Sequence, residues 1–344
     1  MNSAFLGDAL FVVIALSWTV YLVQEIFITG SSALNLALAK DEGERKQIQV
    51  ASGLHWDGIE VWLIAAIVLT FGAFPLAFAT SFTVLYVVFF LLLYALITRG
   101  VVIETLYKLD NPKWIRANAI AWSVSSGLIV FLLGVYVTSL FYGLPIEADH
   151  SASGSVFALF NVTTIGGGLL FLSLALASGA AWIALTTEGR IADSSTALIK
   201  KYGIFLMPPV FLLLVFMGFN VLDNSIFIGA LFTAAPILFV LPALTFVASL
   251  GVLYFGLKQQ ADRLFLFALL TMALFLVTGF VGTYPIVLPS RVDPAFGITI
   301  ADAMTQVASA RIIFIAVCFF YPLILFYQGW KYKRFAQKVK PHDA

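Results

Sequence analysis

Long apolar runs dominate the chain, and short polar or charged stretches separate them. A helix needs about 20 predominantly apolar residues to cross the hydrocarbon core of a membrane. Runs of this kind occupy residues 9–29, 59–78, 80–98, 119–142, 158–186, 204–222, 230–256, 264–288 and 310–330. The pattern predicts an all-α, polytopic transmembrane bundle of about nine helices, forming one transmembrane domain over residues 1–344.

Some boundaries between these runs are less regular than the others. A tight turn near Ala77–Thr80 is expected between the second and third spans, and Asn220, Asp223 and Asn224 favour a short loop after the sixth. The longest connections are residues 30–58 and 286–309. The first of these contains a charged run over residues 40–46, which predicts either a short amphipathic surface helix or a solvated loop.

The composition excludes a water-soluble domain. Hydrophobic residues make up 61% of the chain and charged residues 11%, whereas soluble domains carry about 25% charged residues. The formal net charge of +1 gives no indication of a nucleic-acid partner. The single cysteine, Cys318, cannot form a disulfide within the chain and does not indicate a thiolate metal site. No basic residue precedes the first apolar run, so we expect this run to be retained as a span.

The distribution of basic residues predicts the orientation. With nine spans, only Arg291 and Arg311 of the 19 basic residues fall on the side of the N-terminus. Basic connections stay in the cytoplasm, which places the N-terminus outside and the C-terminus inside. The connection at residues 144–154 carries acidic residues and no basic one, as expected for an external loop.

Four ionisable residues are expected near the cytoplasmic end of the first two spans. Glu25 lies in the inner third of the first span, and His55, Asp57 and Glu60 lie at the start of the second. Asp57 and Glu60 are three residues apart and share a helix face. Ionisable groups at membrane depth are costly and mark functional sites such as proton relays, and burial moves carboxyl groups toward proton exchange near neutral pH.

Each of these residues also has a structural interpretation. Asp57 would favourably begin a helix, because acidic groups stabilise helix N-termini. Glu60 would be solvated or paired with a basic residue, and His55 would hold a backbone carbonyl. Glu25 has the weakest structural explanation, since nothing in an apolar helix requires a carboxylate there.

The histidines do not form a pattern for haem binding. Haem iron takes axial His, Met, Cys or Tyr ligands, and the three histidines are His55, His150 and His342, of which the last two fall in an external loop and the basic tail. Met207, Met217 and Met272 are interpreted as packing residues. The sequence contains no phosphate-binding glycine loop, zinc motif or nucleophile–base pattern, so no catalytic residue or metal site is predicted in this chain.

Several short motifs resemble one family in the same order along nearly the whole chain. Residues 55–63 read HWDGIEVWL, which is similar to a characteristic stretch of subunit II of cytochrome bd-type quinol oxidases. The further motifs are Arg99-Gly100-Val101 with Glu104, Asn111-Pro112-Lys113-Trp114, Gly179-Ala180-Ala181-Trp182 with Thr187-Glu188-Gly189, Tyr284-Pro285 with Asp293-Pro294 and Ile298-Thr299-Ile300, and Tyr327-Gln328-Gly329-Trp330. One element departs from the family pattern, which has two acids near the end of the first helix. Here Glu25 stands at the first position and Ile28 at the second, so the chain resembles a divergent member.

The resemblance implies a haem-poor subunit of a quinol:dioxygen oxidoreductase in a bacterial or archaeal plasma membrane. It implies pairing with a subunit I that holds haem b and haem d, contact with lipid, and quinol oxidation by the complex. Members of the family can also hold a quinone in this subunit or bind a small accessory subunit. The resemblance assigns a proton path to Asp57 and, by position, to Glu25, with Glu60 and His55 as neighbouring candidates.

Two other functions account for part of the sequence pattern. In one, the chain is only a scaffold that stabilises subunit I, which the substitution at Ile28 favours. In the other, it is a secondary transporter, which is expected to have midplane carboxylates and inverted repeats. The acids here lie toward one face of the membrane and no repeat is evident, so the transporter is disfavoured.

Overall fold

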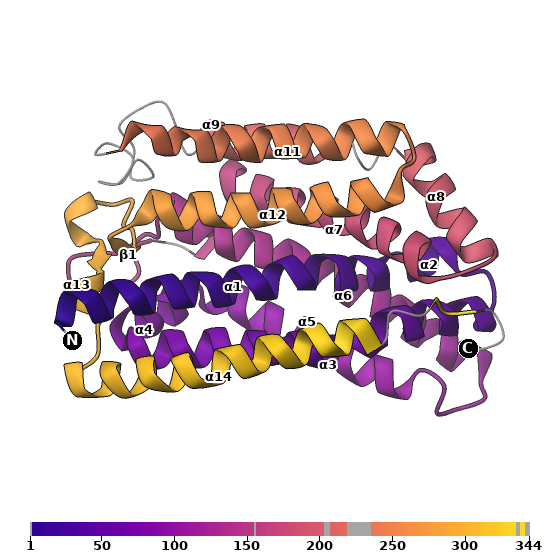
Figure 1. Ribbon diagram of the computed structural model, residues 1–344, viewed down its shortest axis with the longest axis horizontal. Helices are drawn as coiled ribbons and strands as arrows, with labels where there is room; N and C mark the ends of the chain where they lie inside the picture. Colours follow the sequence, from indigo (N-terminus) through magenta and orange to yellow (C-terminus); the bar gives the residue numbers. More distant parts are fainter. Residues whose placement is uncertain (1, 155, 203–206, 219–234, 335–337, 341–344) are drawn as a thin grey trace.

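The computed structural model describes residues 2–154, 156–202, 207–218, 235–334 and 338–340. The helices run side by side along the long axis of the molecule (Figure 1). The helices are α1 (Ser3–Ala33), α2 (Asn35–Leu38), α3 (Glu42–Ala73), α4 (Pro75–Val84), α5 (Tyr86–Thr105), α6 (Pro112–Tyr142), α7 (Val162–Thr186), α8 (Arg190–Tyr202), α9 (Met207–Gly218), α11 (Val240–Leu257), α12 (Ala261–Thr283), α13 (Ile300–Ala303) and α14 (Val307–Arg334). Three short 3₁₀ turns, at Val156–Leu159, Pro236–Phe239 and Pro294–Phe296, and two strands, β1 (Ile286–Leu288) and β2 (Ile298–Thr299), complete the described elements.

The helices have the length and apolar character of membrane spans. In the described ranges, seven are long and apolar enough to cross a membrane, and eight if the two parts of α3 count as one bent span. The predicted all-helical bundle is therefore confirmed, whereas the count of nine stays a prediction. The sixth and seventh predicted spans include residues outside the described ranges. Asn220, Asp223 and Asn224, with the loop expected there, also lie outside these ranges.

The centre of the bundle is the contact of α1, α6 and α7, and glycines allow this contact to be close. A Cβ atom on Gly30 would lie 1.9 Å from the carbonyl oxygen of Ala175 in α7, and one on Gly179 would lie 2.4 Å from the backbone of Gly30. Small residues at such crossings let helix backbones approach within the membrane. α14 lies on the outside of the bundle, where Ile312 and Phe326 are largely exposed.

The second predicted span begins earlier than expected. Asp41 caps α3 through a hydrogen bond from the backbone N–H of Glu44, so the charged run at residues 40–46 opens this helix. The expected long connection over residues 30–58 is therefore wrong, because α1 continues to Ala33 and α3 starts at Glu42. Asp57 consequently lies within α3 and directly precedes its second part, Gly58–Ala73, which is bent by 42° relative to Glu42–Gly53, so the interpretation based on the helix dipole stays a prediction.

The turn between the second and third spans also differs from the expectation. Residues 77–80 lie inside α4, and the helical path is instead interrupted at Phe74 and Leu85. Pro75 at the first turn of α4 has no backbone N–H to continue the hydrogen bonding of α3, which explains the break before it. The helix predicted over 264–288 likewise ends at Thr283, and β1 follows it.

The connection predicted at residues 286–309 is an ordered structure at the end of the bundle that holds the N-terminus (Figure 1). β1 pairs with β2 in an antiparallel ladder, with Ile286 opposite Thr299. α13 follows with a capping box, in which Thr299 and Asp302 satisfy each other's backbone N–H groups. The opposite end carries α2, α8 and the C-terminus. Which end faces the cytoplasm stays a prediction from the distribution of basic residues.

Candidate functional site: an ion cluster between α1, α3 and α5

A buried arginine joins two carboxylates from different helices. Nη1 of Arg99 in α5 lies 2.5 Å from Oε1 of Glu25 in α1, and Nη2 contacts Oε1 of Glu60 in α3. The hydroxyl of Thr29 donates a hydrogen bond of 2.6 Å to Glu25 and accepts one of 2.5 Å from Nη1 of Arg99. Glu25 and Arg99 are 1% and 2% exposed, whereas the side chain of Glu60 is 24% exposed.

Helix geometry places these groups together. Glu25 and Thr29 are four residues apart and therefore neighbours on one face of α1. α1 packs against α3, and this contact brings Glu60 to the same site. Arg99 lies in the last two turns of α5, from where its long side chain reaches both acids.

Burial makes the pairing necessary. An isolated charge in an apolar interior is strongly unfavourable, and breaking a buried ion pair costs about 3–5 kcal/mol. Because Arg99 hydrogen-bonds both acids, each charge has a partner. With both carboxylates ionised, however, the cluster holds two negative charges and one positive charge.

The structure brings together two of the four residues singled out in the sequence. Glu25 and Glu60 meet at Arg99, and Glu60 is paired with a basic residue, as one interpretation anticipated. Asp57 and His55 lie within α3, which corrects the placement of His55 before that helix, and their side chains fall outside the described part. The proton-path role of all four stays a prediction.

Arg99 and Thr29 were not recognised as site residues from the sequence. The sequence predicts Arg99 in a connection, because it follows a strongly apolar run. The structure instead places it inside α5 and buries it. One signal in the sequence could have identified Arg99 as a site residue. It lies near the same end of the bundle as Glu25, and a charge at membrane depth requires an opposite partner.

The C-terminal motif packs against the segment that follows Asp57. Gln328 in α14 donates a hydrogen bond of 2.7 Å to the carbonyl oxygen of Gly58, and Tyr332 donates one of 3.1 Å to Gln24 in α1. A Cβ atom on Gly58 would approach Nζ of Lys331 to 3.0 Å. Two motifs far apart in the sequence thus form one contact beside the ion cluster.

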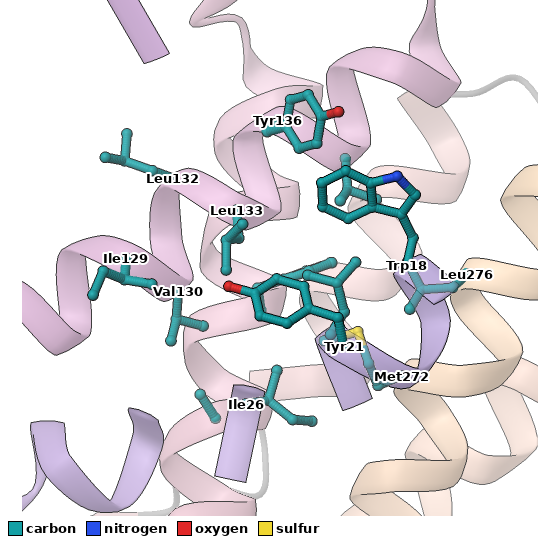
Figure 2. Close-up of a cluster of buried hydrophobic side chains, with 14 of the residues drawn as sticks. Trp18, Tyr21, Ile26, Ile129, Val130, Leu132, Leu133, Tyr136, Met272 and Leu276 are labelled. Atoms are coloured by element: carbon teal, nitrogen blue, oxygen red, sulfur yellow. The ribbon is translucent and has the colours of Figure 1, made fainter. Parts of the chain in front are cut away.

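Toward the N-terminal end of the bundle, the ion cluster is followed by apolar side chains. Figure 2 shows Trp18 and Tyr21 of α1 among Val130, Leu133 and Tyr136 of α6. The rings of Trp18 and Tyr136 are 5.7 Å apart, and those of Trp18 and Tyr21 are 6.1 Å apart. A cavity of about 60 Å³ beyond them is lined largely by apolar residues. These residues separate the ion cluster from the end of the bundle that holds the N-terminus.

Two carboxyl groups in the loops at the end of the bundle that holds the N-terminus have lowered pKa values, because neighbouring residues donate hydrogen bonds to them. A hydrogen bond of 2.6 Å from the hydroxyl of Thr299, with a further bond from its backbone N–H, lowers the pKa of Asp302. Hydrogen bonds from the side chain and backbone of Ser151 similarly lower the pKa of Asp149. These carboxylates order the loops at this end of the bundle and take no part in the buried ion cluster.

Apolar helices of spanning length with an ion cluster buried between them define a multi-pass membrane protein with an ionisable site. The chain matches the profile of the family described as cytochrome bd terminal oxidase subunit II over residues 6–335. The chain belongs to this family. It is therefore a subunit of a terminal oxidase, a complex for which the family implies haems and a subunit I partner.

Known relatives align with this chain along nearly their full lengths. The chain is 29% identical over 341 residues to cytochrome bd ubiquinol oxidase subunit 2 of Bacillus subtilis, covering 98% of this chain and 97% of that protein. It is 25% identical over 351 residues to cytochrome bd-I ubiquinol oxidase subunit 2 of Escherichia coli K12, covering 94% and 92%. A chain in the structure of bd oxidase from Geobacillus thermodenitrificans matches with a TM-score of 0.75 and 16% identity, covering 97% and 99% of the two chains, which shows a shared fold.

The described side chains do not fit a haem site within this chain. Haem iron needs axial ligands such as His or Met. His150, the histidine whose side chain is described, lies in the connection between α6 and α7. Met272 is buried among apolar residues (Figure 2), whereas Met207 and Met217 are largely exposed, so their interpretation as packing residues within this chain was wrong. We therefore derive no step through a haem in this subunit.

Proposed function

We propose that the ion cluster of Glu25, Arg99 and Glu60 binds and passes protons that move from the cytoplasm toward the oxygen-reducing haem of subunit I. The single observation that carries this proposal is the sharing of one guanidinium by two carboxylates. With both acids ionised the cluster has one excess negative charge, and burial disfavours a net charge. Binding one proton makes the cluster neutral, and releasing it restores the charge.

The unequal exposure of the two acids gives the path a direction. Glu25 is enclosed between helices, whereas Glu60 is partly exposed on α3. The same helix presents exposed apolar residues such as Ile64 and Val68, a surface suited to subunit I. A proton taken up at Glu25 would pass through water beside Arg99, whose guanidinium stays protonated, to Glu60 and then to the partner. The apolar side chains around Trp18 and Tyr136 would prevent leakage to the opposite end.

Asp57 and His55 extend this proposal along α3. Asp57 precedes Glu60 by three residues and therefore shares its helix face. Both residues stay candidates for the same path on the basis of their position and of the family resemblance. In the proposal they exchange protons with Glu60 and with the cytoplasm.

The complex is proposed to act as a quinol:dioxygen oxidoreductase, in line with the ubiquinol oxidase names of the relatives. Subunit I would hold haem b and haem d, and this chain, as one transmembrane domain, would hold no essential haem. It would cross a bacterial or archaeal plasma membrane nine times, with its N-terminus outside. An apolar pocket of about 210 Å³ that includes Leu63, Phe89 and Tyr136 has room for part of a quinone tail. A small accessory subunit would be a further partner.

The test uses the assembled, haem-replete complex in lipid nanodiscs. Glu25→Gln, Glu60→Gln and Asp57→Asn each remove a proton-binding site while keeping the shape of the side chain. We expect quinol-driven oxygen uptake to fall about 10-fold or more in the Glu25 variant, since general acid–base groups contribute at least this much. Glu104→Gln, an exposed change on the same helix as Arg99, is the control. Unchanged turnover of all three variants between pH 6 and pH 8 would refute the proposal.

A purely scaffolding role is the second candidate, and the geometry of the ion cluster also supports it. Arg99 ties α1, α3 and α5 together, which a structural clamp would also do. As a scaffold, the chain would keep haem in subunit I, and its loss would release that haem. Acid-to-amide variants with full haem content and full turnover would favour this role, whereas full haem content with slow turnover would favour the proton path.

A further inference from the structure

Three buried residues beside the α1–α6 contact carry polar atoms without a hydrogen-bond partner. Asn35 and Ser126 are completely buried and Trp122 is nearly so. Both amide atoms of Asn35, the Oγ of Ser126 and the Nε1 of Trp122 lack partners in the described structure. Buried polar groups almost always form hydrogen bonds with protein or with ordered water. Several unsatisfied groups in one region therefore indicate bound water.

The register of α1 and α6 places these groups next to the ion cluster. Ser123 of α6 donates a hydrogen bond of 3.5 Å to the backbone carbonyl oxygen of Ser32 in α1, and Trp18 of α1 contacts Tyr136. These two contacts define an antiparallel pair in which Ser126 lies level with Thr29. Ser126 shares a helix face with Trp122 and with Ser123, because it follows them by four and three residues.

The register of α5 leads to the same position. Thr105 lies 3.4 Å from Asn118, and the rings of Phe89 and Tyr136 are 5.1 Å apart. In this antiparallel pair, Arg99 lies level with Ser125 and Ser126. The Nε of Arg99 is also buried and has no partner in the described structure. An unsatisfied donor of the ion cluster thus lies at the level of an unsatisfied hydroxyl group.

We propose that a short row of water molecules binds along Asn35, Trp122 and Ser126 and ends at Arg99 and Glu25. Six residues separate Asn35 from Thr29, a rise of about 9 Å along a helix. Two waters span this distance, because they make three hydrogen bonds of about 2.8 Å between the two ends. The site offers both donors and acceptors, as bound water requires.

The row provides the uptake branch of the proposed proton path, and this inference rests on that proposed function. α2, which carries Asn35, lies at the end of the bundle with the C-terminus, and its Leu36 is exposed (Figure 1). Each water in the row accepts one proton from its neighbour and donates one to the next. The last water transfers its proton to the carboxylate of Glu25, so no other reactant is needed. Beyond this point Tyr21, whose hydroxyl also lacks a partner in the described structure, points toward Val130 and Leu133, and these apolar side chains offer the row no further partner (Figure 2).

The first test is a cryo-EM map of the wild-type complex at a resolution that shows ordered water. We expect water density within hydrogen-bond distance of Ser126 Oγ and of the Asn35 amide. In Ser126→Ala and Asn35→Leu that density is lost, and oxygen uptake per haem falls about 5-fold, the effect of one hydrogen bond.

A matched control is available one residue away. Ser125 is also buried, but its hydroxyl donates to the carbonyl oxygen of Trp122 at 3.2 Å. Ser125→Ala should therefore keep both the water density and the turnover. The absence of water density along Asn35, Trp122 and Ser126 would overturn the inference. Equal turnover of Ser126→Ala, Asn35→Leu and Ser125→Ala would overturn it as well.

The inference and the proposed function fail in different ways. If Glu25→Gln slows turnover and no water density is found along the row, the role of Glu25 stands and the water row is wrong. If water is present but Glu25→Gln has normal turnover, the proton path through Glu25 is wrong, and the uptake role of the row fails with it.

Discussion

Arg99 and Glu25 form a direct ion pair, with 2.5 Å between Nη1 and Oε1, although 74 residues separate them in the chain. Each is almost completely buried, so each provides the opposite charge that the other needs. Glu60 joins the pair from a third helix. This relationship links the stability of the bundle to the site proposed for proton transfer.

Replacing Arg99 by Met should destabilise the subunit strongly. The substitution removes the guanidinium that both carboxylates contact and leaves the buried Glu25 without its cation, at a cost of about 3–5 kcal/mol. Thermal unfolding of the purified complex, followed by haem release and by tryptophan fluorescence, measures this loss. The double variant Arg99→Met with Glu25→Gln should recover part of it, because one uncompensated charge is removed. Strictly additive effects would show that the two residues do not interact.

A methyl group on Gly30 should separate α1 from α7. The added Cβ would overlap the backbone at Ala175, and overpacking of this kind costs about 1–3 kcal/mol. We expect Gly30→Ala to lower the unfolding temperature of the complex. Gly127→Ala is the control, since a Cβ atom there meets no neighbour within 4 Å. Equal unfolding temperatures for the two variants would contradict the close contact.

Loss of the Gln47 side chain should release the C-terminal segment. Its Nε2 donates to the carbonyl oxygens of Glu188 and Val339, at 2.9 and 2.8 Å, and thereby joins α3 to the residues after α7 and after α14. Gln47→Leu should cost about 1–2 kcal/mol, since two hydrogen bonds are lost, while the carbonyl oxygen of Val339 keeps its bond from the N–H of Glu188. Limited trypsin digestion after Lys338 should become faster. Gln306→Leu, an exposed change, should leave the cleavage rate unchanged.

The capping box at α13 should make part of the stability dependent on pH. Hydrogen bonds from Thr299 lower the pKa of Asp302 in the folded chain. A carboxyl group with a lowered folded pKa stabilises the protein above its unfolded pKa of about 3.9, and this contribution is lost as the pH falls through the lower, folded value. Thr299→Val should therefore cost about 0.5 kcal/mol at pH 7, the low end for an exposed cap. The difference in unfolding temperature from wild type should shrink below about pH 4, and a constant difference would exclude this origin.

The apolar runs alone were sufficient to predict an all-helical membrane bundle. A membrane span must be both helical and apolar over its length, because lipid offers no hydrogen bonds to the backbone. The same constraint identified Glu25, since a carboxylate in such a run is costly. The order of the short motifs indicated the family to which the chain belongs, and the family profile confirms it.

Hydrophobicity did not determine where helices begin and break. The start of α3 at Glu42 depends on a cap formed by Asp41, and the break at Phe74 on the missing N–H of Pro75. Both are local hydrogen-bonding effects within stretches where the apolar pattern gave a different boundary. The earlier start places Asp57 within α3, ahead of its bent second part, rather than at the first residue of the helix.

The sequence by itself determined the class of fold, the family and the presence of isolated acids at membrane depth, because each of these is encoded in local runs of residues. The tertiary structure decided which partner those acids have. Arg99 meets Glu25 and Glu60 only because α1, α3 and α5 pack at one site. Such a pairing depends on side chains far apart in the sequence, and local patterns carry no information about which distant charge fills a buried site.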